Sequence, residues 1–179
     1  MRFIKHFLFV LLLPSAMYGQ TVHIDEDRIV YKGTVDVVQV NKEELYERVK
    51  NAVYDNVKGG KEAILEDNKD KGIITVKGTM KLATPYHLIR TVGYILELSV
   101  DEGKYKYRID SVNMKQVERG GKTIKISSTE LFKGMEATGP EAVEAEKLLN
   151  EIDMNFQKLL DLINADMKKS SLEKNSTRD

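Results

Sequence analysis

The sequence predicts a single two-layer α+β domain, in which an antiparallel sheet of about five strands is covered on one face by two helices. Three observations predict this class. Several segments between residues 28 and 127 alternate apolar and polar side chains, which is the period of a half-buried strand. Two segments, 41–58 and 140–169, repeat apolar residues at helical spacing. The order of the elements, β-α-β-β-β-β(-β)-α, lets one sheet receive both helices on the same side.

The first 19 residues have the layout of a secretory signal peptide. Two basic residues precede an unbroken apolar run, Phe7–Leu13, and small residues follow it. A membrane span needs about 20 apolar residues, so we expect a cleaved signal rather than an uncleaved anchor. The expected cut follows Gly19 and leaves Gln20 first, with a cut after Ala16 as the alternative. The protein is therefore expected to be exported, to the periplasm in the first place or else to the extracellular space.

The composition of the exported chain limits the classes of partner and binding site that we expect. Removal of residues 1–19, which hold two of the 28 basic residues and none of the 28 acidic ones, leaves 26 basic and 28 acidic residues, a net charge of −2. This balance disfavours broad binding to nucleic acid, which needs a basic surface. The chain has no cysteine, so it holds neither disulfides nor thiolate metal sites nor a lipid on an N-terminal Cys. We expect its hydrophobic core to carry its stability.

The polar segment 20–27 is expected to be a loose lead-in, and the domain itself to span 28–169. Residues 28–39 form the first predicted strand, because apolar and polar side chains alternate there. Asn41 is a good N-cap for the helix that follows, and Glu44, three residues on, fits a capping box. The apolar face of this helix ends before Gly59-Gly60, where glycine favours a helix C-cap.

The middle of the chain predicts antiparallel strands joined by short turns. Asp101-Glu102-Gly103 is a tight hairpin signal between two well-alternating segments. The strands are expected at residues 62–66, 73–82, 88–100, 105–117 and, as a short edge strand, 123–127. One face of this sheet would pack against the helices. The other would carry Thr, Lys and Glu side chains to solvent.

The C-terminal helix begins at Pro140, which suits the first helical position, and its apolar residues recur at four-three spacing. Residues 131–138 predict no clear element, and residues 170–179 are polar and expected to be disordered. The apolar stripe extends over about three heptads, so two interpretations stay open. Packing on the sheet beside the first helix is favoured. A homodimer seam through Phe156 and Leu159 is the alternative.

Several segments resemble an uncharacterised domain family of secreted bacterial proteins that is described as having a TBP-like fold, after the TATA-box-binding protein. The resemblance covers roughly residues 28–117, and its strongest segments are VNKEELYERVKNAV, DNKDKGIITVKGTMKL and YILELSVDEGKYKYRID. It implies the fold, an exported location and relatives in Gram-negative bacteria, but no reaction, because the family has none assigned. TATA-box-binding protein bends DNA with a basic sheet built from two repeats. This chain has one copy, no net positive charge and an export signal, so we expect no nucleic-acid partner.

Candidate catalytic and metal-binding residues are few. His23 and His87 lie in no metalloprotease or hydrolase motif and are interpreted as surface residues. Asp67, Asn68 and Asp70 resemble part of a calcium loop, but lysines occupy two positions where oxygen ligands belong, so a polar hairpin is favoured. The glycine pairs 59-60 and 120-121 are interpreted as turns rather than phosphate-binding loops.

Three tyrosines could form a stacking surface, but they alternate with charged residues and share a face with Leu96 and Ile109, which favours core packing. They are Tyr94, Tyr105 and Tyr107. We therefore predict no catalytic, cofactor-binding or metal-binding residues and no cofactor. The leading hypothesis is a non-catalytic cell-envelope domain that binds a protein, peptide or glycan through its sheet edge or solvated face. The alternative is an envelope hydrolase that uses two carboxylates with raised pKa.

Overall fold

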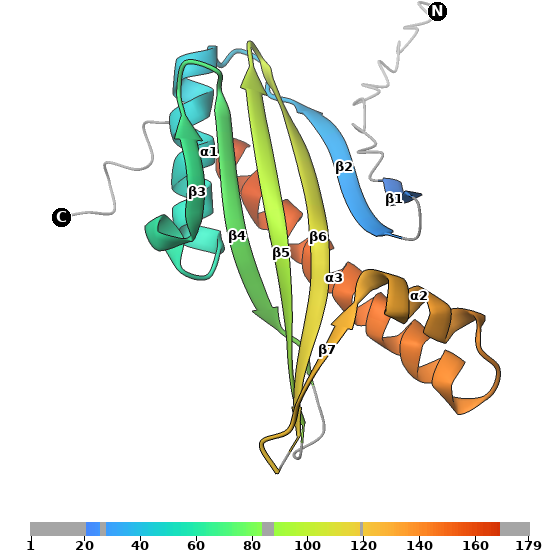
Figure 1. Ribbon diagram of the computed structural model, residues 1–179. Coiled ribbons are helices and arrows are strands. Elements are labelled where there is room, and N and C mark those ends of the chain that lie inside the picture. The colour runs from blue at the N-terminus through green and yellow to red at the C-terminus, as the bar shows by residue number, and fades with distance from the viewer. Residues whose placement is uncertain (1–20, 26–27, 84–87, 119, 169–179) are drawn as a thin grey trace, which may run out of the picture.

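The structure, a computed structural model, describes residues 21–25, 28–83, 88–118 and 120–168 (Figure 1). The expected signal peptide lies outside the described residues, and so does the expected tail at 170–179. No helix among the described residues is long and apolar enough to cross a bilayer.

All strands of the described part join one antiparallel sheet in the order β1-β2-β6-β5-β4-β3. The seventh strand, β7, pairs with β6 along the edge that β6 also offers to β2. The strands are β1 (Thr21–Asp25), β2 (Arg28–Asp36), β3 (Ile64–Asn68), β4 (Ile73–Lys81), β5 (Leu88–Asp101), β6 (Lys104–Glu118) and β7 (Thr123–Ser127). The predicted class, an α+β domain with an antiparallel sheet, is confirmed.

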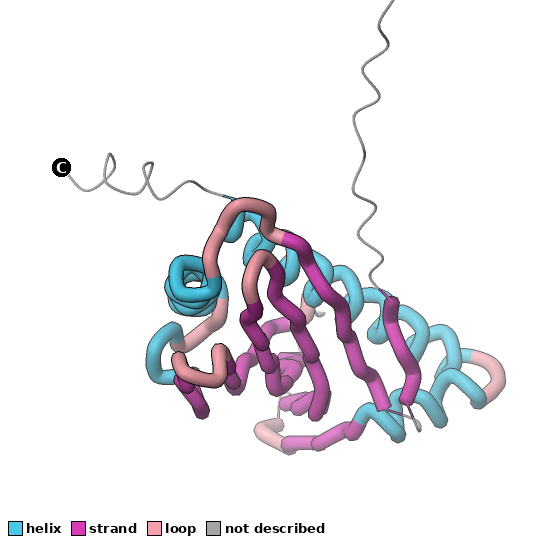
Figure 2. The backbone as a smooth tube through the Cα atoms, turned by 90° about the horizontal axis from the view of Figure 1, so that it is seen from above, coloured by secondary structure: helices cyan, strands magenta, loops and turns pink. Residues whose placement is uncertain are grey.

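The helices lie together on one side of the sheet, and no helix of the described residues covers the other side (Figures 1 and 2). Helix α1 packs against α3, and α2 packs against α3 near the other end of the molecule. The helices are α1 (Lys42–Asn56), α2 (Ser128–Glu136) and α3 (Pro140–Lys168), with a short 3-10 helix η1 (Gly60–Ala63) after α1. This arrangement leaves one sheet face open to solvent.

The start of α1 follows the predicted N-cap. The side-chain oxygen of Asn41 accepts a hydrogen bond of 2.8 Å from the backbone N–H of Glu44. The capping box is only half formed, because the Glu44 carboxylate pairs instead with Arg48 at 2.5 Å. Arg48 also donates a bond of 2.7 Å to the Met167 carbonyl near the end of α3. One guanidinium therefore ties α1 to the last turn of α3.

Aromatic side chains pack where α3 crosses the middle of the sheet. The ring of Phe156 lies 4.9 Å from that of Tyr31 and 5.1 Å from that of Tyr94, the latter edge-on. Tyr94 fits because Gly78 stands opposite it on β4, where a Cβ would overlap the tyrosine ring. The same packing of a tyrosine ring over a glycine occurs between β6 and β2, where Tyr107 lies over Gly33.

A β-bulge interrupts β6 halfway along. Gly93 of β5 pairs with Asn113 and Ile95 pairs with Asp110, so β6 has one residue more than β5 between these pairs. Ser111 sits in the extra position with a φ of 53°, in the left-handed region. Beyond the bulge the buried face of β6 changes from odd-numbered to even-numbered residues. The bulge also separates the part of β6 that pairs with β2 from the part that pairs with β7.

Four details differ from the sequence-based expectations. The segment 20–27, expected to be a loose lead-in, contains strand β1, which pairs with the neighbouring strand β2. The sheet has seven strands in the described part rather than about five. The strand expected at 62–66 begins later, because η1 occupies residues 60–63. Within 131–138, the ambiguous segment, residues up to Glu136 belong to α2, whose N-cap Ser127 and Glu130 form a capping box.

The contact between Gly78 and Tyr94 predicts a stability effect. Substitution Gly78→Ala is expected to lower the free energy of unfolding by about 1–3 kcal/mol, because the added methyl group must displace a buried ring. Gly120→Ala is the control, since a Cβ there meets nothing within 4 Å. Urea denaturation of both variants measures the effect. Equal stability of the two would contradict the packing described here.

Candidate binding surface

The open sheet face is the largest surface that the described helices leave uncovered, and it is polar as predicted. Thr75, Lys77, Thr79 and Lys81 of β4 point to this side, and Glu97 of β5 lies directly opposite Thr75. The sequence predicts Thr, Lys and Glu side chains on the solvated face, and the strand register confirms that these five residues share one face. The sheet has therefore one apolar face under the helices and one polar face.

Charge on the open face is unevenly distributed. On strands β2 to β7, the register places nine basic and five acidic residues on this face, so these strands give it +4. The basic residues are Arg28, Lys32, Lys77, Lys81, Lys104, Lys106, Arg108, Lys115 and Lys125, and the acidic ones are Asp36, Glu66, Glu97, Asp101 and Asp110. All these acidic residues lie level with the bulge or on the side of it that leads to the turn between β5 and β6. Beyond the bulge, this face carries lysines but no carboxylate among the described residues.

Three of these lysines form a row across the sheet. Lys125 of β7 lies opposite Lys115 of β6, which lies opposite Thr91 of β5, which lies opposite Lys81 of β4. Strands are about 4.8 Å apart, so the row extends roughly 14 Å. A fourth lysine, Lys77, lies on the same face, four residues before Lys81 on β4. We call Lys77, Lys81, Lys115 and Lys125 the lysine row.

The lysine row is not neutralised within the described structure. All four side chains are exposed, and none takes part in an ion pair with another described residue. Like charges directly opposite each other on neighbouring strands are destabilising. The pair Lys115 and Lys125 therefore costs stability that a neutral or opposite pair would not.

Sequence reasoning missed Lys115 for a physical reason. Strict alternation continued from Tyr105, Tyr107 and Ile109 places residue 115 on the covered face, whereas the bulge turns it to the open face. The signal was in the sequence, because the next apolar residue after Ile109 is Val112, three positions on rather than two. Such a break in the alternation is typical of a bulge.

A shallow groove lies on the same face, on the hairpin side of the bulge. Its volume is about 410 Å³, and its polar lining includes Lys32, Lys106 and Arg108 together with Glu97. Arg108 bonds to Asp110 at 2.9 Å. Basic and acidic groups are mixed here, in contrast to the lysine row.

A larger cleft lies on the other side of the molecule, along the outer face of α3. It measures about 930 Å³ and is bordered by Ala83, Lys147 and Asn150. Val143 and Met154, which are 66% and 71% exposed, line it as well. The cleft is wide open to solvent.

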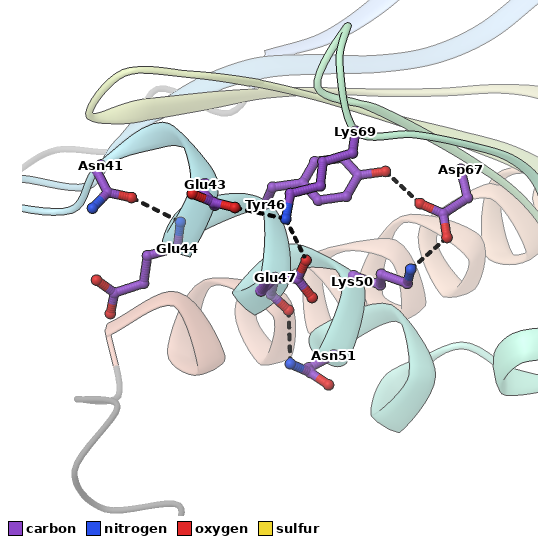
Figure 3. A network of polar contacts seen from close by, with 9 residues as sticks. All are labelled: Asn41, Glu43, Glu44, Tyr46, Glu47, Lys50, Asn51, Asp67 and Lys69. Atoms are coloured by element: carbon purple, nitrogen blue, oxygen red, sulfur yellow. Dashed lines mark hydrogen bonds and ion pairs between the residues drawn. The ribbon is translucent and has the colours of Figure 1, made fainter.

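The polar network between α1 and β3 has a structural role (Figure 3). The buried Tyr46 donates to Asp67 at 2.5 Å, and Lys50 pairs with the other carboxylate oxygen at 2.5 Å. The hydrogen bond from Lys50, followed by that from Tyr46, lowers the pKa of Asp67. Lys69 of the adjoining turn reaches Glu43 at 2.8 Å. These contacts fasten the edge strand β3 to α1.

This network bears on the calcium-loop interpretation of Asp67, Asn68 and Asp70. Asp67 and Asn68 end strand β3, and both oxygens of Asp67 are already bound by Tyr46 and Lys50. The turn at residues 69–72 closes a hairpin to β4, as favoured from the sequence. The described residues contain no group of three acidic, His or Cys side chains placed to hold a metal ion.

The other residues singled out by sequence are placed as follows. Tyr94, Tyr105 and Tyr107 are buried in the core, which confirms the packing interpretation. Phe156 and Leu159 are buried as well, so they do not form an exposed seam, and a homodimer through α3 would have to use the outer face of that helix.

The remaining candidates are histidines and glycines. His23 belongs to β1, while His87 lies outside the described residues. Gly59 and Gly121 have positive φ and lie in turns, as expected, whereas Gly60, which also has positive φ, begins η1.

Comparison with known proteins agrees with this architecture. Residues 31–115 match a family described as "Domain of unknown function (DUF4468) with TBP-like fold". The crystal structure of a DUF4468 family protein from Bacteroides ovatus matches with a TM-score of 0.64 and 12% identity, over 88% of this chain and 94% of that one. A TBP-like protein from Parabacteroides distasonis matches with a TM-score of 0.61 and 10% identity, over 80% and 97%. At such identities these structures show the fold alone. No curated protein matches the chain.

The lysine row predicts an unusual effect of charge reversal. Lys125→Glu is expected to raise the free energy of unfolding by about 0.2–1 kcal/mol, because a repulsive cross-strand pair becomes attractive. Lys122→Glu is the matched control, since Lys122 is exposed in the turn before β7 and has no strand partner. It should change stability by less than about 0.5 kcal/mol. Chemical denaturation at low salt tests both, and destabilisation by Lys125→Glu would contradict the register.

The lowered pKa of Asp67 predicts a pH dependence. Its stabilising effect is fully present above the ordinary aspartate pKa of about 4 and is lost as pH falls through the lower pKa of the folded state. Asp67→Asn should therefore cost roughly 0.5–1 kcal/mol at neutral pH, after allowance for partial exposure, and progressively less in acid. Asp70→Asn is the control. Denaturation curves between about pH 2 and 7 measure the difference, and a cost independent of pH would refute the ion pair.

Proposed function

We propose that this DUF4468-family domain with a TBP-like fold is an exported, non-catalytic binding domain of the cell envelope. Its open sheet face is the surface that contacts a protein, peptide or glycan. The observation that carries the proposal is the lysine row, which is exposed and unpaired on the sheet face that the described helices leave free. A surface that costs stability and fills no packing role is best explained by a contact with another molecule.

The location in the proposal follows from the signal-peptide pattern of residues 1–19, with the periplasm as the first destination. Two features support a binding rather than a catalytic role. The polar groups of the open face lie along a shallow sheet surface, and the groove among them holds about 410 Å³. Lysine is the commonest charged residue on this face, and an exposed ammonium group binds anions as a point charge.

No observation favours the alternative of a carboxylate-dependent hydrolase. That mechanism needs a carboxyl group whose pKa is raised so that it can act as an acid. Among the described residues, the carboxyl groups with a clear shift are Glu43, Asp67 and Glu130, and the pKa of each is lowered. A hydrogen bond to a lysine or to an N-cap serine is the leading cause in each case.

Site-specific crosslinking in the living cell tests the proposal. A photoreactive side chain at Asn113, exposed on the open face beside the lysine row, is expected to give adducts with an envelope component. The same side chain at Lys158, exposed on α3, is the control and should give few. Mass spectrometry identifies the products. Adducts from Lys158 alone, or from neither site in an exported and folded protein, would overturn the proposed contact surface.

A further inference from the structure

We propose that the lysine row binds a linear anionic polysaccharide, whose acidic groups supply the counter-charges that the described part of the domain does not provide. This inference rests on the proposed function, because it names the ligand class of the same open face. The first support is charge. Lys81, Lys115 and Lys125 lie beyond the bulge, where the described strands place no carboxylate on this face, and Lys77 lies level with the bulge.

The geometry of the row favours a chain-like ligand. Lys81, Lys115 and Lys125 stand in register on β4, β6 and β7, so their Cα atoms lie on a line that crosses the strands over roughly 14 Å. A compact anion would contact one or two of these ammonium groups. A polymer with repeated acidic groups, lying across the strands, can contact all three at once.

Neutral polar groups surround the lysines and suit a ligand rich in hydroxyls. Thr91 stands within the row, between Lys115 and Lys81. The adjacent set of paired residues consists of Ser127, Asn113, Gly93 and Thr79, also in register across the four strands. The Ser127 hydroxyl is already bound to Glu130 in the α2 capping box. The hydroxyls of Thr79 and Thr91 and the amide of Asn113 can donate and accept hydrogen bonds, so they can bind sugar hydroxyls beside the charged groups.

Two other polyanions fit the surface less well. Single-stranded nucleic acid is bound by basic grooves with aromatic side chains on which the bases stack. The tyrosines of the described strands, Tyr31, Tyr94, Tyr105 and Tyr107, all lie on the covered face. An anionic membrane is the stronger competitor, because the exposed Ile89 lies on the same face two residue pairs beyond the row and could enter a lipid surface. Both serve as competing ligands in the test.

The test uses the exported protein and heparin as the polysaccharide probe, with alginate as a carboxylated polymer and dextran as an uncharged one. The triple variant Lys81→Glu/Lys115→Glu/Lys125→Glu is expected to bind heparin roughly 10- to 100-fold more weakly at about 0.1 M salt. The slope of log affinity against log salt should fall by about two to three, because three cation contacts are lost. Dextran should not bind either protein.

A matched control distinguishes the effect of the lysine row from the effect of a change in net charge. Lys58→Glu/Lys147→Glu/Lys158→Glu changes the net charge equally but lies on the helix layer, where all three lysines are exposed. It should weaken heparin binding by less than about threefold. Equal loss in both triple variants would overturn the proposal. The triple substitution to Gln, with circular dichroism of each variant, removes the charges without reversing them and shows whether lost binding reflects lost folding.

The remaining outcomes distinguish the two proposals. Tighter binding to single-stranded DNA or to vesicles of anionic lipid than to both acidic polysaccharides would refute the ligand class while leaving the open face as the contact surface. The same holds if Asn113 crosslinks to an envelope protein and neither polysaccharide binds. If Asn113 gives no adducts in the exported protein with its lysine row intact, and the lysine-row variant binds heparin as tightly as the unmodified protein, both proposals are refuted.

Discussion

The β-bulge at Ser111 is the constraint on which the rest of this structure depends. One extra residue of β6 faces β5 there, so the side of the sheet to which β6 side chains point reverses between Ile109 and Val112. At the same place β2 stops pairing with β6, and β7 takes over the same edge a few residues later. The bulge thus divides one long hairpin into two halves that bend separately while both present apolar side chains to the helices.

The core is organised around the same point. Tyr94 is the β5 residue that faces the bulge, and its ring crosses Gly78 of β4 to meet Phe156 edge-on. Helix α3, about 43 Å long at 1.5 Å per residue, is long enough to cover both halves of the hairpin. Arg48 fixes one end of it to α1, and α2 packs beside the other. Disruption at the bulge would therefore reach every layer of the domain.

Much of this fold could be predicted from the sequence because local signals agreed with each other. The N-cap at Asn41, the hairpin at Glu102-Gly103, the edge strand at 123–127 and the start of α3 at Pro140 all rest on short-range chemistry, and the structure has them at those residues. Strand β1 and helix α2 were missed because each is a short segment whose own pattern is weak and which is held by the element that follows it, β2 or α3. The lysine row was missed because its central member, Lys115, depends on a register change.

The uneven charge distribution of the domain supports the proposal that the open face binds an anion. After removal of the signal peptide the chain is expected to carry −2, yet the open face of strands β2 to β7 carries +4, which leaves −6 for all other residues. Folding does not require this separation, because an acidic residue at position 125 would stabilise the β6–β7 pair. An uneven field of this kind attracts anions to one side and repels them from the other, so it orients a partner before contact. The lysine row, which forms no ion pair with another described residue, therefore lowers the stability of the free domain. The domain regains that stability when an anion binds to the row.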